Sequence, residues 1–422
     1  MRSSQAAGDR VVGFPALLAL GVNGIVGVGI FFAPASVAAE VPGATGVLVY
    51  LGTALLLLPV AAAYAALGGR FPEDGGPYVW AREAFGPRFA FHVGWIAFTS
   101  AVFSMAAVVS GLAHHASPLF GIQAGAGERT FAVGSVVVLA GVASAGLRPS
   151  AVAWTTVTFL KLVPLLALVV LGVLAASAIP RAAAPAPPSH DVERAALVVI
   201  FACQGFEIVP LLAGSVRRPE RSVPLATVLS LLFAVALYAT LHALAVRAVP
   251  GLGASKAPLV DAARVYGGSA AAGVVALGAN VSALGIAFGM INTTPRYLST
   301  LAGPSGLRPW VGALDENLVP RPALLITTVL VVILVSVAHQ VTELFVLSSL
   351  AVLAQYGVAL AALAVLGLRR SRGLGLRHVV AVPLAGVGIL LAARGANPGE
   401  LGVLAVVLAL GEILRRAAQA RV

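Results

Sequence analysis

Apolar segments of roughly 20 residues alternate along the whole chain with short polar segments, and each is long enough to cross a hydrocarbon core of about 30 Å as a helix. The twelve segments are 14–34, 44–67, 89–113, 130–147, 151–179, 195–214, 223–249, 267–292, 322–338, 342–367, 378–393 and 400–414. Gly, Pro and Arg are common in the connections between them. The pattern predicts an all-α integral membrane protein with twelve transmembrane helices and no soluble domain between them.

The composition supports this prediction, since 59% of the residues are hydrophobic and only 10% are charged, with a mean hydropathy of +0.98. The net charge of +11 does not indicate nucleic acid binding, because the basic residues are scattered at the ends of the apolar segments. Most of the 27 Lys and Arg residues fall in connections that are cytoplasmic if the N-terminus is inside. By the positive-inside rule, we expect both termini in the cytoplasm and the protein in the cytoplasmic membrane.

The first apolar segment contains the glycine-rich stretch "GVNGIVGVGIFFAP" (21–34). Each glycine inside a helix costs about 1 kcal/mol relative to alanine, and lipid offers a freed backbone group no other partner. Gly21 and Gly24 could form a small-residue face for close helix packing. That explanation does not cover Gly29, so we expect an unwound break at Gly27, Val28 and Gly29. The half-helix after the break would begin with free amide N–H groups and a positive dipole end, which suit a carboxylate.

A second segment, "FACQGFEIVP" (201–210), is interrupted in mid-membrane by a glycine, a carboxylate and a proline. Its break would free the carbonyls of Phe201, Ala202 and Gln204, which suit an ammonium group. It lies five segments after the first interruption, as two five-helix halves require. Paired interruptions at corresponding positions of two halves indicate the binding site of a secondary transporter.

Two ionisable residues lie deep in the expected spans: Glu207 among the 16 acidic residues and Lys161 among the 27 basic ones. Such residues are costly in lipid unless they are paired or hydrated, and they commonly mark function. A lysine can release its proton when its surroundings change, whereas an arginine cannot. The two residues lie at similar depth, so a direct ion pair that only stabilises the bundle is the alternative. No histidine or acidic pair has the spacing of a metal site, so we expect no metal, no cofactor and no enzyme activity.

Five stretches together resemble the amino acid-polyamine-organocation superfamily of permeases: "GVGIFFAP" (27–34), "GRFPEDGGPYVWAREAFGPRFAFHVGW" (69–95), "FLKLVPLLALVVLG" (159–172), "FACQGFEIVPLLAGSVRRPERSVPLATVLS" (201–230) and "TTPRYLSTLAG" (293–303). The resemblance implies a leucine-transporter-like fold with spans 1 and 6 unwound at mid-membrane. This fold has two inverted five-helix repeats, here about 14–179 and 195–367, followed by two extra spans at about 378–414. Residues 1–422 are therefore expected to form a single transmembrane transporter domain.

The resemblance also implies roles for individual residues. The residues expected to bind the substrate are Ile25, Gly27, Val28, Gly29, Phe201, Ala202, Gln204 and Glu207. Within this set, the backbone at 27–29 meets a carboxylate and Phe201 is an aromatic gate. The carbonyls that meet the amine are those of Ile25, Phe201, Ala202 and Gln204. Lys161 matches a lysine whose ammonium takes the place of a sodium ion between spans 1, 5 and 8, near Ser282.

The combined expectation is a sodium-independent secondary transporter of amino acids that works by alternating access, with proton coupling or exchange. Because Glu207 is the only acid deep in the spans, a small or apolar neutral amino acid is favoured. Two alternatives stay open: an antiporter of basic amino acids or polyamines, and a membrane sensor on the same fold that transports nothing. The expected partners are the amino acid, the lipid bilayer and protons.

Overall fold

A computed structural model describes residues 12–41, 43–71, 75–146, 151–175, 177–178, 190–303, 306–338, 340–380 and 382–420. The regular elements in these ranges are helices, and single bridges join Val12 to Val216 and Ala302 to Leu307. The α-helices are α1 (Phe14–Ile25), α2 (Gly29–Glu40), α3 (Thr45–Arg70), α4 (Pro77–Phe85), α5 (Pro87–Ala116), α6 (Ala126–Ser144), α7 (Ala151–Ala175), α8 (Val192–Cys203), α9 (Ile208–Leu211), α10 (Pro219–Ala248), α11 (Pro258–Thr300), α12 (Arg321–Val337), α13 (Val341–Leu368), α14 (Leu376–Val379), α15 (Val382–Ala393) and α16 (Pro398–Gln419).

In the described part of the chain, nine helical segments are long and apolar enough to cross a membrane, and the bent pair α1 and α2 makes a tenth. The segments α8 to α9 and α14 to α15 each count as one span in this number. The other two expected spans fall on α12, an apolar helix of 17 residues, and on α16, which carries several charged residues near its ends. The protein is therefore an all-helical, multi-pass membrane protein, and the count of twelve spans in two inverted repeats stays a prediction.

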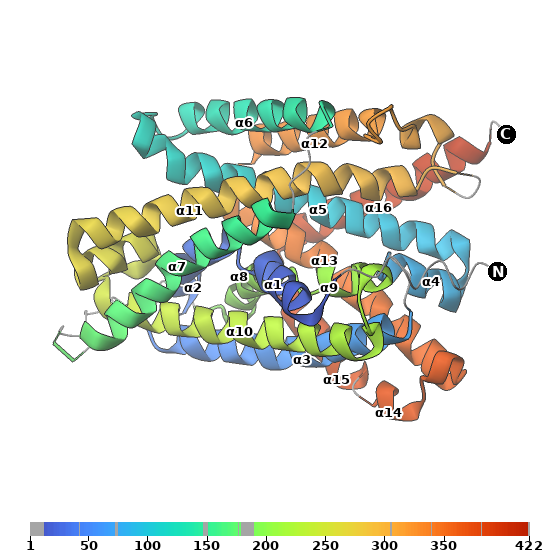
Figure 1. Ribbon diagram of the computed structural model, residues 1–422, viewed down its shortest axis with the longest axis horizontal. Coiled ribbons are helices and arrows are strands. Elements are labelled where there is room, and N and C mark those ends of the chain that lie inside the picture. The colour runs from blue at the N-terminus through green and yellow to red at the C-terminus, as the bar shows by residue number, and fades with distance from the viewer. Residues whose placement is uncertain are drawn as a thin grey trace.

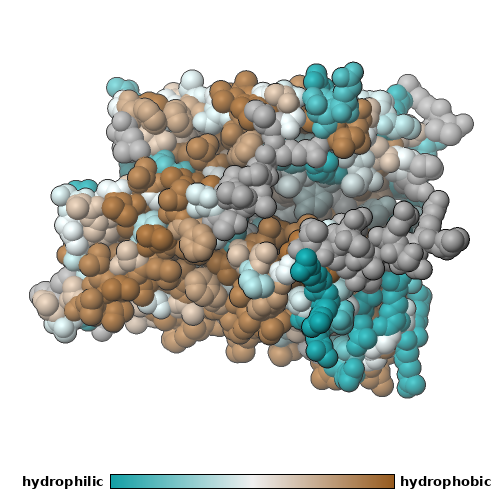
Figure 2. Space-filling view, in the orientation of Figure 1, coloured by the Kyte–Doolittle hydropathy of each residue, from teal (hydrophilic) through white to brown (hydrophobic). Residues whose placement is uncertain are grey.

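The long helices run roughly along the longest axis of the molecule (Figure 1). Figure 2 shows apolar side chains over most of the flank formed by α7, α10 and α11, and hydrophilic residues gathered toward the right-hand end. The exposed apolar side chains include Leu160, Leu229 and Leu277. An apolar flank along helices of this length is the surface that lipid tails cover.

Proline and glycine set several of the helix boundaries. Helices α4, α5, α10, α11 and α16 each begin with a proline. Proline suits the first turn because its missing N–H would have no partner there and its fixed φ is already helical. Gly268, with φ 72° and ψ −165°, interrupts α11, so a short helix leads into the span expected at 267–292.

Both segments with the interrupting glycines are broken. Helix α1 ends at Ile25 and α2 begins at Gly29, with a bend of 45° between them. The broken first span is thus confirmed, but the break covers residues 26–28, and Gly29 is the first residue of α2 because Val28 already has helical φ and ψ. Helix α8 ends at Cys203, and the helix after the second break, α9, has only four residues.

Candidate functional site

The two breaks lie against each other with almost no side chain between them. Gly205 has a φ of 121°, which residues other than glycine rarely adopt. A Cβ on Gly205 would overlap the carbonyl group of Gly24 and lie 2.6 Å from the amide nitrogen of Ile25. Farther along, a Cβ on Gly29 would lie 3.0 Å from the Cα of Ala202. The glycines therefore let α1 and α2 contact the end of α8 backbone to backbone.

The small-residue packing considered for the first segment is also present. A Cβ on Gly21 would lie 2.8 Å from a methyl group of Val209 and 2.9 Å from the Ser230 side chain. A Cβ on Gly24 would lie 3.0 Å from the carbonyl oxygen of Gly205. By contrast, a Cβ on Gly27 would lie 2.8 Å from the end of the Ile286 side chain and 3.7 Å from the carbonyl oxygen of Ile25. Helix packing thus explains the presence of glycine at position 27 less well than at positions 21, 24 and 29.

An aromatic cluster covers one side of the breaks. The ring of Phe201 stacks on that of Phe345 from α13, with centroids 4.2 Å apart and planes at 20°. Phe32 of α2 meets Phe345 edge to face at 5.9 Å. Val28 is 1% exposed and Phe201 is 7% exposed. Of the residues expected to bind the substrate, Gln204 and Glu207 are partly exposed and the other six are buried, so the described conformation is closed on the aromatic side of the breaks.

Hydroxyl groups from other helices bind the backbone and side chains at the breaks. Tyr238 of α10 donates a hydrogen bond to the carbonyl of Ile25 at 2.9 Å, which uses one of the two lone pairs of that carbonyl. The amide oxygen of Gln204 accepts from Ser348 at 3.0 Å and from Ser104 at 3.3 Å. Sequence reasoning did not pick out Tyr238 or Ser348 for the site, because a single hydroxyl in a long apolar segment has no distinguishing pattern.

Glu207 binds at the second break itself. Its Oε2 accepts a hydrogen bond from the amide N–H of Gly205 at 2.9 Å and from the Tyr356 hydroxyl at 3.2 Å. The carboxylate thereby pairs the amide of Gly205, which lies in the break between α8 and α9 and not inside either helix. No ion pair between Glu207 and Lys161 is found among the described residues, so the alternative of a direct pair has no support.

Lys161 joins α7 to the first broken helix. Its side chain is completely buried, and its Nζ donates a hydrogen bond to the carbonyl oxygen of Asn23 at 2.7 Å. Asn23 lies in the last turn of α1, directly before the break. A hydrogen bond from a charged donor is worth about 1.5–3 kcal/mol. The expected link between span 5 and the broken span 1 is therefore present as a contact.

Ser282 of α11 lies opposite Lys161 in the packing of α11 on α7. A Cβ on Gly278 would overlap Pro164, and a Cβ on Gly285 would overlap Val157. These two contacts on either side set an antiparallel register that places Ser282 across from Lys161. Ser282 is completely buried, and its Oγ has no hydrogen-bond partner in the described part of the chain. Lys161 Nζ binds the Asn23 carbonyl of α1, and no hydrogen bond joins Lys161 to Ser282 in the described part of the chain.

A family model described as "Amino acid permease" matches residues 12–396. The chain belongs to the amino acid permease family. This permease is 31% identical over 412 residues to an uncharacterized transporter of Mycobacterium tuberculosis (strain ATCC 25618 / H37Rv), covering 95% of this chain and 90% of that protein. It is 28% identical to the human cationic amino acid transporter 4, over 53% of this chain and 38% of that protein. It is 24% identical to the serine/threonine exchanger SteT of Bacillus subtilis (strain 168), over 69% of this chain and 68% of that protein.

The family match confirms the resemblance of the glycine-rich and lysine-containing stretches to these permeases. This permease is accordingly a transporter and not an enzyme, with an amino acid as the class of substrate that its family implies. The match ends at residue 396, so α16 lies beyond it.

Proposed function

We propose that this permease carries amino acids across the cytoplasmic membrane by alternating access, with the substrate bound at the two breaks. The observation that carries the proposal is the backbone contact between the α1–α2 break and the end of α8, in a chain of this family. Helix ends that meet inside a membrane bring unpaired N–H and C=O groups to one place. The carboxylate and ammonium of an amino acid are complementary to those groups.

The backbone groups divide between the two charges of the substrate. The amides of Gly27, Val28 and Gly29 at the start of α2 suit the carboxylate, since the positive end of the helix dipole lies there. The free lone pair of the Ile25 carbonyl and the carbonyls of Phe201 and Ala202 suit the ammonium. The substrate must move Phe201 or α13 to enter, because these residues are buried in the closed conformation.

A small or apolar neutral amino acid fits these surroundings best. The Phe201 and Phe345 rings form an apolar wall, and Gln204 with its serine partners adds neutral polar groups. SteT is named for serine and threonine, which supports a neutral substrate. The human relative is named for cationic amino acids, and this second candidate would need the carboxylate of Glu207 to leave Gly205 and Tyr356 for the substrate.

Lys161 is the residue that we assign to coupling, with Ser282 as its second partner. A lysine ammonium between α1, α7 and α11 can replace a bound sodium ion, because it brings one positive charge to the same carbonyl groups. A change in exposure between the two access states would allow the ammonium to release its proton, which favours proton coupling, while a permanently charged lysine would serve an exchanger. The two inverted repeats, 14–179 and 195–367, supply the rocking motion in this proposal.

The test is a binding and counterflow experiment with purified protein. A thermal-shift screen against the common amino acids and polyamines identifies ligands, because binding to the native state raises apparent stability. Liposomes preloaded with the best ligand should then accumulate the labelled ligand transiently from outside. Ligand binding without counterflow would identify a sensor instead, and stabilisation by polyamines alone would favour the cationic alternative.

A further inference from the structure

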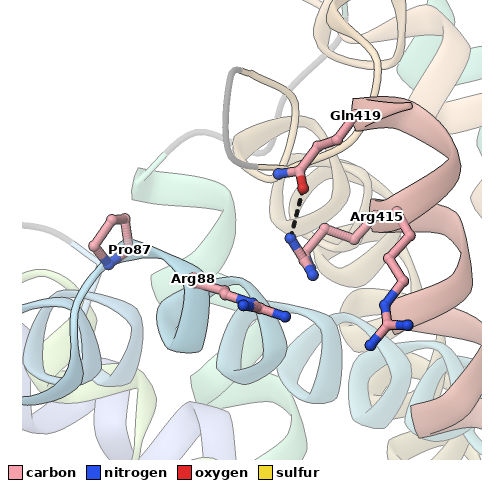
Figure 3. A pocket seen from close by; sticks show the side chains of 5 residues that line it. Pro87, Arg88, Arg415 and Gln419 are labelled. Carbon is pink, nitrogen blue, oxygen red and sulfur yellow. Dashed lines mark hydrogen bonds between the residues drawn. The ribbon is translucent and has the colours of Figure 1, made fainter. Parts of the chain in front are cut away.

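A basic hollow lies at one end of the helix bundle, away from the two breaks. It has a volume of about 440 Å³ and is lined by Pro87 and Arg88 at the start of α5 and by Arg415, Arg416 and Gln419 at the end of α16. Figure 3 shows Arg88 and Arg415 on facing helices, with Gln419 bound to Arg415. The hollow lies at the right-hand end of the molecule in Figure 1, where α5 begins and α16 ends. No role in the proposed transport cycle falls on these residues.

The charges around the hollow do not balance. One carboxylate, Glu412, accepts hydrogen bonds from Arg415 at 2.7 Å and from Arg416 at 2.6 Å. Arg88 and His92 also approach it, at 3.7 Å and 3.3 Å. Three guanidinium groups thus share a single carboxylate, which leaves two positive charges uncompensated even with a neutral histidine.

The arginines differ in how many of their guanidinium N–H groups remain available for a ligand. Arg415 is 4% exposed and uses its guanidinium nitrogens on Glu412 and Gln419, so it is a fixed part of the wall. The side chains of Arg88 and Arg416 are 71% and 70% exposed. Arg416 binds Glu412 through Nε, and no partner of its two Nη nitrogens is found among the described residues. These two side chains can therefore donate to an anion in the hollow.

The length of α5 places the hollow at the level expected for lipid headgroups, and its walls are fixed to each other. Helix α5 has 30 residues, a length of about 45 Å, so its first turn extends beyond a hydrocarbon core of about 30 Å. Two turns into α5, the Trp95 indole donates to the carbonyl of Val407 in α16 at 2.8 Å. A Cβ on Gly411 would lie 2.5 Å from the same ring, so the two helices pack closely just below the hollow.

We infer that this hollow binds the phosphate of an anionic phospholipid, held by Arg88 and Arg416. Arginine favours phosphate because its planar guanidinium can donate two parallel hydrogen bonds. A lipid is the source, rather than free phosphate, because exposed apolar side chains on the same turns of α16, namely Leu410, Ile413 and Leu414, offer a surface to the acyl chains. Basic pockets between membrane helices are known to hold anionic headgroups.

The experiment measures phosphatidylglycerol binding to the full-length protein in a neutral detergent by native mass spectrometry. The wild type is compared with the double variant Arg88→Gln/Arg416→Gln. The matched control is Arg370→Gln/Arg377→Gln, which removes two exposed arginines, one directly after α13 and one in the first turn of α14. Because all four side chains are exposed, each variant should elute and unfold as the wild type does without lipid. Phosphatidylcholine and inorganic phosphate are titrated in parallel.

The expected result is a loss of at least tenfold in phosphatidylglycerol affinity for the Arg88/Arg416 variant and less than twofold for the control variant, with weak phosphatidylcholine binding throughout. Equal losses in the two variants would show a diffuse charge effect and overturn the site. Inorganic phosphate that binds as tightly as phosphatidylglycerol, and displaces it, would overturn the assignment to a lipid.

Discussion

Replacing Gly205 by alanine tests the contact between the two breaks through the free energy of unfolding. The new Cβ would overlap the carbonyl of Gly24, which is backbone and cannot rotate away. A non-glycine residue at a φ of 121° costs about 1–3 kcal/mol, and forced shifts in a packed interior cost about another 1–3 kcal/mol. The expected destabilisation is therefore about 2–6 kcal/mol, on the basis of both effects.

Gly27→Ala is the matched control, because its Cβ would press only on the terminal methyl group of Ile286. A displaced rotamer of Ile286 costs about 0.5–1.5 kcal/mol. The protein is heated in detergent, and the fraction that remains folded is measured by size-exclusion chromatography. The unfolding midpoint should drop by on the order of 5 °C or more for Gly205→Ala and by less for Gly27→Ala.

Transport separates the two glycines further. Gly27→Ala should reach the membrane folded and yet lose substrate affinity, because in the proposed binding mode the substrate carboxylate approaches the backbone at Gly27. If Gly205→Ala unfolds at the wild-type temperature and transports at the wild-type rate, the backbones of the two breaks are not in contact.

Phe201→Ala should leave the protein folded but weaken substrate retention, seen as a raised half-saturation constant in uptake; an unchanged constant would remove Phe201 from the gate. Glu207→Ala should destabilise the protein by about 1–3 kcal/mol for each donor it leaves unpaired on Gly205 and Tyr356, and Glu207→Gln should restore most of this in thermal unfolding; equal losses in the two would contradict the role of the side chain as acceptor for these donors. A cysteine at Lys256 should react with an impermeant maleimide from outside and one at Arg377 only after permeabilisation, and the reverse pattern would invert the predicted orientation.

Local chemistry in the sequence predicted the positions of the breaks well. Two glycines around Val28 and the glycine before Glu207 are costly inside a membrane helix, so their presence alone indicates an interruption. The pattern could not decide whether Gly29 belongs to the break or to α2, because that depends on Val28 adopting helical φ and ψ. It also could not show that α9 is only four residues long, since the apolar residues after Glu207 fit a longer helix equally well.

Partners across helices were much harder to predict. Lys161 and Glu207 stood out because charge is rare in the spans, and equal depth made an ion pair reasonable. The structure gives them separate partners, Asn23 and Gly205, because each binds a backbone group freed at the end of a broken helix. Tyr238 gave no signal in the sequence, since its role depends only on which carbonyl its hydroxyl reaches.

We propose that the ammonium of Lys161 takes the place of a sodium ion at the α1 break. The direct measurement is the initial rate of substrate uptake into liposomes, with external sodium varied at fixed ionic strength and with an imposed pH gradient, for the wild type, Lys161→Ala and Lys161→Arg. We expect a wild-type rate that does not change with sodium and that rises with an inward proton gradient. Lys161→Ala should have impaired turnover, and Lys161→Arg should show no response to pH, because arginine keeps its proton. A strict requirement of the wild type for sodium would contradict this proposal.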